Sequence, residues 1–147
     1  FKSARDGRSP AGWYTRLRAP FLNLDGFLCE IYNTSFFSEL GKKLGMQDIV
    51  IEHALFDDKF IIKSNNVNKT KSLFDIERIR QLIHIFPEVY LHVRTDKRFL
   101  GSFHPAGLNE VYFETIETVS DMQKLESLFE LYSLMLNKLC DMDSGYR

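Results

Sequence analysis

The densest group of side chains that could do chemistry lies between residues 52 and 58. It consists of Glu52, His53, Asp57 and Asp58. Carboxylates beside an imidazole can transfer protons or hold a metal ion, so this group could serve a small hydrolase or a metal-dependent enzyme. Adjacent residues of a strand face opposite ways, however, so Glu52 and His53 should not converge. The simpler interpretation is a solvated loop between two strands.

Other motifs of enzymes and cofactor-binding proteins are missing from the sequence. The four histidines show neither i, i+4 pairing nor zinc-finger spacing beside cysteines; they are His53, His84, His92 and His104. We expect His84 near the end of a helix, where a cation suits the helix dipole. No glycine-rich phosphate loop and no Gly-x-Ser-x-Gly elbow occurs. The sequence therefore predicts no catalytic, cofactor-binding or metal-binding residue, and no cofactor.

Strands are indicated by period-two alternation and by β-branched runs. These patterns predict strands at residues 13–21, 27–31, 49–51, 60–62, 89–93, 99–103 and 111–116. Pro20 cannot donate to a ladder, which favours an edge position or the end of a strand. Asp25-Gly26 is typical of a tight hairpin turn and predicts that residues 27–31 return beside the first strand.

Three helices are indicated by apolar residues at helical spacing. The first runs from a cap at Asn33 or Thr34 to Leu44, and the second follows Ser64-Asn65-Asn66 and ends before Pro87. The third begins at a Thr118 or Ser120 cap, and its predicted buried face consists of Met122, Leu125, Phe129, Tyr132, Met135 or Leu136, and Leu139. We therefore predict an α+β fold: a mainly antiparallel sheet of about six or seven strands, two shorter helices and a long C-terminal helix.

The size and composition of the chain favour one domain. It has 147 residues, of which 44% are hydrophobic and 13 are phenylalanine, so core material is plentiful. Residues 1–11 are polar and predict a flexible N-terminal segment ahead of a single globular domain over residues 12–147. Cys29 and Cys140 lie far apart in apolar runs and are expected to be small buried hydrophobes, which is compatible with a reducing compartment.

The charge distribution limits the class of partner. A net charge of −1 argues against a dedicated nucleic-acid binder. Residues 1–18 carry five basic residues against one acidic residue, whereas residues 109–147 carry eight acidic residues against three basic ones. This asymmetry mostly describes solvated faces, although it could mark a surface for a partner or a membrane. The sequence has no run of about 18 apolar residues, so it contains no membrane-spanning segment.

One stretch resembles a known group of domains. Residues 46–65 include Phe56-Asp57-Asp58-Lys59-Phe60 and Lys63-Ser64-Asn65. In this they are similar to a family of bacterial domains of unknown function that share the motif Phe-Asp-x-x-Phe-x-x-Lys-Ser-Asn. The resemblance covers about residues 13–140. Members often follow hydrophobic N-terminal segments, which implies the soluble part of a membrane-anchored protein. No activity and no catalytic residue comes with it.

These observations lead to one main hypothesis and two alternatives. The main one is a non-catalytic interaction domain with an unknown protein partner, located in the cytoplasm and attached to a membrane, if at all, only through a segment outside this chain. The first alternative is a hydrolase or metal-dependent enzyme that uses Glu52, His53, Asp57 and Asp58. The second is a domain that binds a lipid or another apolar ligand, prompted by the many aromatic residues.

Overall fold

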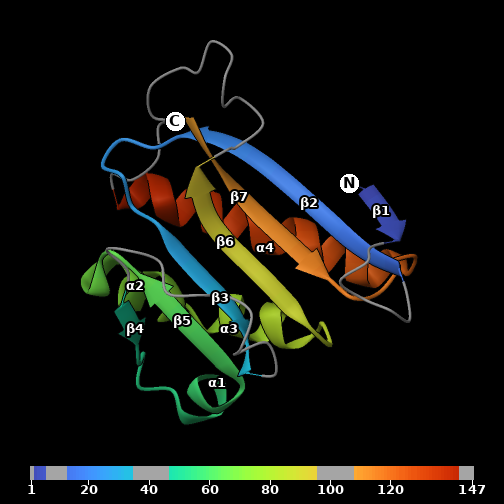
Figure 1. Cartoon of the computed structure of the whole chain (residues 1–147), viewed down its shortest axis with the longest axis horizontal. Helices are drawn as coiled ribbons and strands as arrows, with labels where there is room; N and C mark the ends of the chain where they lie inside the picture. Colours follow the sequence, from blue (N-terminus) through green and yellow to red (C-terminus); the bar gives the residue numbers. More distant parts are fainter. Residues whose placement is uncertain (1, 6–12, 35–46, 96–107, 143–147) are drawn as a thin grey trace.

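The alternating sequences assemble into a seven-stranded antiparallel sheet (Figure 1). The computed structural model describes residues 2–5, 13–34, 47–95 and 108–142. The strands are β1 (Lys2–Arg5), β2 (Trp13–Leu22), β3 (Cys29–Asn33), β4 (Gln47–Ile49), β5 (Phe60–Ser64), β6 (Val89–Thr95) and β7 (Leu108–Thr115). Their spatial order is β1-β2-β7-β6-β3-β5-β4. The predicted α+β class and antiparallel sheet are confirmed.

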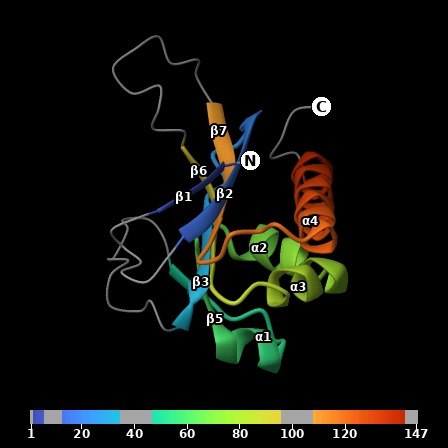
Figure 2. The ribbon, with the colours of Figure 1, turned by 90° about the vertical axis from the view of Figure 1, so that its right-hand side faces the viewer.

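The helices form a layer on one face of this sheet (Figure 2). They are α1 (Ala54–Lys59), α2 (Val67–Phe74), α3 (Glu77–His84) and α4 (Met122–Asp141). The core lies between the layers. It contains apolar side chains from each inner strand, such as Leu17, Ile31, Ile62, Leu91 and Phe113, and helical residues such as Leu73, Ile79, Leu82, Leu128 and Met135. No helix in the described residues is long and apolar enough to cross a membrane.

The predicted hairpin between the first two long strands is wrong. The turn itself forms, since Gly26 has φ +76° and the Asn23 side chain accepts hydrogen bonds from the N–H groups of Asp25 and Gly26. However, β7 and β6 lie between β2 and β3 in the sheet. Turn chemistry reverses the chain locally, but the partner of β3 is decided by long-range pairing with β5 and β6.

Several predicted element boundaries also change. Residues 2–5, placed in the flexible N-terminal segment, form β1 and pair with residues 13–16 of β2. Pro20 pairs with Glu110 of β7, and it lies outside residues 13–16 of β2, which pair with the described residues of β1. The predicted second helix is divided into α2 and α3 around Asp75 and Ile76. The helix predicted up to Leu44 and the strand at 99–103 fall outside the described residues.

The long C-terminal helix is confirmed, and Tyr132, Met135 and Leu139 are buried as predicted, but the cap and the N-terminal half of the buried face differ from the prediction. Asp121 is the N-cap, because its side chain accepts a hydrogen bond from the N–H of Gln123. The face that packs on the core consists of Leu128, Leu131, Tyr132, Met135 and Leu139. Met122 and Phe129, predicted to be buried, are 67% and 51% exposed. The helix carries two apolar stripes, and one of them packs against the sheet.

Candidate functional site

The four residues at 52–58 do not form a common site. Asp57 accepts hydrogen bonds from the backbone N–H groups of Ile51 and His53, each at 3.1 Å. Glu52, held between these two anchored groups, has φ +67°, in the left-handed region that non-glycine residues rarely adopt. The Asp57 carboxylate is therefore used to hold a strained bend at the start of α1.

The other members of this group point to separate partners. Glu52 pairs with Lys71 at 3.4 Å, and His53 Nε2 lies 3.6 Å from Asp75 Oδ1. Asp58 is exposed on α1, a helix in a segment where we expected a loop. No hydrogen bond or ion pair joins the four side chains, all of which belong to the described part of the chain. The arrangement does not provide a shared acid–base or metal-binding centre.

Beside this bend, an open groove of about 300 Å³ separates α1 from α3. Its lining includes His53, Leu55 and His84. The His84 ring contacts the edges of two core rings, with centroids 5.5 Å from Phe56 and 5.2 Å from Phe60. Burial, and then the nearby Lys59 charge, lowers the pKa of His84. The expected helix-end cation is therefore disfavoured here by packing.

This lowered pKa predicts a loss of stability in acid. Because the folded-state pKa of His84 lies below its unfolded value, the unfolded chain binds more protons as the pH falls through about 6.5. We expect denaturant melts between about pH 7.5 and 5 to show wild type losing stability relative to His84→Leu. If the difference between the two proteins is the same at every pH, His84 does not contribute to the acid sensitivity.

The sheet face opposite the helices carries a buried polar layer. Adjacent strands align Lys63, Glu30, His92, Tyr112 and Arg18 in one row across β5, β3, β6, β7 and β2. Glu30 and His92 are only 1% and 5% exposed. Glu30 and His92 could exchange a proton in principle, because they are neighbours in this row. Both side chains are so little exposed, however, that they have almost no contact with solvent.

Ion pairs and ring contacts bind this polar layer together. Glu110 is 0% exposed; its carboxylate lies 3.0 Å from Arg94 and 4.0 Å from Arg18. Both guanidinium groups also lie over the Tyr112 ring, at 3.7 Å and 5.2 Å from its centroid. Arg16 and Glu114 form a further pair at 3.3 Å. We interpret the layer as an internal ionic network that supports the sheet.

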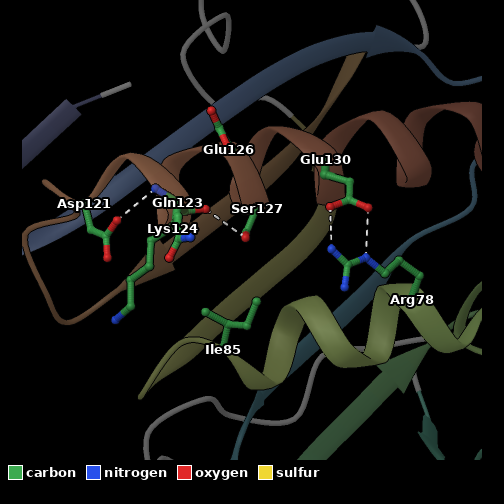
Figure 3. A pocket seen from close by; sticks show the side chains of 8 residues that line it. All are labelled: Arg78, Ile85, Asp121, Gln123, Lys124, Glu126, Ser127 and Glu130. Carbon is green, nitrogen blue, oxygen red and sulfur yellow. Dashed lines mark hydrogen bonds and ion pairs between the residues drawn. The ribbon is translucent and has the colours of Figure 1, made fainter.

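A larger hollow lies between α3 and α4 (Figure 3). Its volume is about 460 Å³, and it is lined by Arg78, Ile85, Asp121, Gln123, Lys124, Glu126, Ser127 and Glu130. Among the described residues of this lining, Ile85, the C-cap residue of α3, is the only apolar one, and it is 40% exposed. Ligand sites commonly span roughly 300–1,000 Å³ but are lined mainly by apolar groups. Most of the residues that line this hollow are charged or polar, so it lacks the mainly apolar lining of such sites.

The charges around this α3–α4 groove leave an acidic surplus. Arg78 donates two hydrogen bonds to Glu130, at 2.8 and 2.7 Å, and this contact lowers the pKa of the Glu130 carboxyl. Lys124 is paired in the same way with Glu117, both contacts being 3.0 Å. After these pairs, the carboxylates of Asp121 and Glu126 have no cationic partner among the described residues of the lining. The groove is therefore electrostatically suited to a positively charged ligand.

The sequence carries a signal for the buried polar layer but not for the α3–α4 groove. Tyr14, Arg16 and Arg18 alternate on β2, and Glu110, Tyr112 and Glu114 alternate on β7, which marks a polar sheet face but not its burial. The groove brings Arg78 and Ile85 at α3 beside residues 121–130 at the start of α4, and no local pattern encodes this packing.

Comparison with known proteins yields no relative: no family model matches the chain, and no curated protein or solved structure is significantly similar. In the described residues, no group of three or more His, Cys, Asp or Glu side chains is placed to hold a metal ion.

Proposed function

We propose that this chain is a non-catalytic interaction domain that binds a basic, amphipathic segment of a partner protein in the α3–α4 groove. The observation that carries the proposal is an exposed apolar side chain, Ile85, set within a hollow whose unpaired charges are carboxylates. A partner segment with an apolar anchor beside Lys or Arg would cover Ile85 and neutralise Asp121 and Glu126.

The contacts of α4 hold the walls of this groove in place. Asp121 caps the helix, Leu128 and Leu131 anchor it in the core, and the Arg78–Glu130 pair links it to α3. The groove walls are therefore held in place before a partner arrives, which reduces the ordering cost of binding. The candidate catalytic residues at 52–58 offer no comparable arrangement, because Asp57 is engaged by backbone N–H groups.

A displayed library of random peptides about 12 residues long provides a test with a defined probe. We expect selection on wild type to enrich peptides that combine Lys or Arg with Leu, Ile or Phe. Ile85→Asp should weaken the selected peptides at least about tenfold, since it places a charge against their apolar anchor. Asp121→Asn with Glu126→Gln should also weaken them and reduce their salt dependence, while the Asn side chain can still cap α4.

Leu55→Asp is the matched control, because Leu55 is 84% exposed but lies on α1, outside this groove. The control should leave peptide affinity unchanged. Selected peptides that lack basic residues, or whose affinity is insensitive to Ile85→Asp, would contradict the proposed site.

For the cellular setting, we propose a cytoplasmic location, with membrane tethering only through a segment outside this chain. The resemblance of residues 46–65 to bacterial domains that follow hydrophobic segments supports this. Cell fractionation of the full-length protein, with protease added to intact and opened cells, tests it. Digestion of the domain in intact cells would contradict a cytoplasmic location.

A further inference from the structure

Helix α1 is attached to the rest of the molecule by few contacts. It has six residues, all of them described, and Phe56 is the only buried one. Leu55 is 84% exposed, and the N-cap residue His53 makes no side-chain capping bond. A helix this short is not stable by itself. The position of α1 therefore depends on the packing of Phe56 and on the bend that precedes the helix.

The bend before α1 is strained and is held from within the helix. The positive φ of Glu52 is unfavourable for a residue other than glycine and persists only where its surroundings hold it. The holding group is the Asp57 carboxylate, which accepts hydrogen bonds from the N–H groups of Ile51 and His53. Because Asp57 belongs to α1, the helix and the strained bend must loosen together.

His84, the last residue of α3, packs against the anchor of α1 from the other side of the α1–α3 groove. Its ring meets the Phe56 ring at 84° and the ring of Phe60, the first residue of β5, at 66°. A neutral imidazole can lie between such rings without a water shell. An imidazolium there would lose hydration and would be repelled by the nearby Lys59 ammonium group on α1.

The charged groups around His84 lie on α1 and on α3 itself. Lys59 acts in the same direction as burial, since both lower the pKa of His84. On α3, Glu77 lies about two turns before His84, and the Arg80 guanidinium donates to a backbone carbonyl at the end of α2. His53, before α1, is directed to a carboxylate at the end of α2. Protonation of His84 therefore adds a positive charge next to Lys59.

We propose that His84 is an acid-sensitive latch for α1: its protonation opens α1 and the bend locally, while the sheet and α4 remain folded. In the opened form His84 regains its ordinary pKa of about 6.5, so this form binds more protons than the closed one. The opened population should therefore rise as the pH falls through this value. Opening relieves the strain at Glu52 and exposes Phe56, which makes an apolar surface available in acid.

Amide hydrogen exchange measured by NMR, with rates corrected for the intrinsic pH dependence of exchange, tests the latch. The N–H groups of Phe56 and Asp57, both bonded to the His53 carbonyl, report on α1, while that of Leu131 in α4 reports on global unfolding. We expect the α1 amides to be less protected than Leu131. Between about pH 7.5 and 5.5 they should lose at least about threefold in protection. His84→Leu should remove this loss, and so should His84→Gln, which cannot ionise.

His53→Gln is the matched control, because it removes the other imidazole of the same groove. The loss of α1 protection in acid should persist in this variant, and thermal melts should show that all three variants are folded. If the α1 amides are as protected as Leu131, α1 opens only when the whole chain unfolds, and the latch is overturned. A loss in acid that persists without His84, or that His53→Gln abolishes, would also overturn it.

Discussion

We expect Phe56→Ala to lower the free energy of unfolding by about 3–5 kcal/mol. The Phe56 ring is 1% exposed and lies between two other core rings, with centroids 4.7 Å from Phe60 and 6.0 Å from Phe74. Truncation removes buried apolar area and leaves a cavity that these rings cannot fill without leaving their own contacts. Phe60, 2% exposed, should behave alike. Denaturant melts give the free energies.

Neighbouring residues provide the controls for this prediction. Leu55→Ala should have little effect, because Leu55 is 84% exposed. Asp57→Ala should cost about 1–2 kcal/mol, like the loss of a helix cap, since two backbone N–H groups lose their acceptor. Asp58→Ala should be nearly silent. An enzyme site would give the reverse profile, with both aspartates dispensable for stability. Such a profile would contradict a structural role for this motif.

We expect the second large effect for Arg94→Ala, which should lower the free energy of unfolding by about 3 kcal/mol. This change removes a cation whose Nε lies 3.0 Å from the fully buried Glu110 carboxylate, while Arg18 remains at 4.0 Å. It also removes the guanidinium from the face of Tyr112. Desolvation makes a buried charge costly once its partner is gone.

A double variant separates charge from packing in this network. Adding Glu110→Gln to Arg94→Ala removes the buried charge, so the double variant should be more stable than Arg94→Ala alone. Arg78→Ala breaks a pair whose side chains are 50% and 43% exposed and should change stability little. If Arg94→Ala is as mild as Arg78→Ala, the polar layer contributes little to the fold.

Local sequence patterns predicted where the strands lie in the sequence better than which strands pair with each other. Alternation located β2, β6 and β7, because a half-apolar strand must separate its two faces. The tight turn at Gly26 was also predictable, but its sequence carries no information about β7 and β6, which insert between β2 and β3. Strand order depends on contacts between residues far apart in the chain.

The long helix shows a second limit of sequence patterns. Met122, Leu125 and Phe129 continue the helical spacing of the buried Tyr132, yet in this half of the helix the core takes Leu128 and Leu131 instead. A helix with two apolar stripes does not indicate which one faces the sheet. Similarly, Ile85 and Asp121 are 36 positions apart in the sequence and meet only through the packing of α3 on α4.

The most direct test of the proposed function is a ¹⁵N–¹H spectrum of the isotopically labelled chain, recorded with and without the highest-affinity basic peptide from the selection. We expect the shifted amide signals to centre on the α3–α4 groove, at Ile85, Lys124 and Ser127, with the signals of β3 and β6 unchanged. Shifts centred instead on the buried polar layer, or on the α1–α3 groove around His53 and His84, would contradict the proposed binding site.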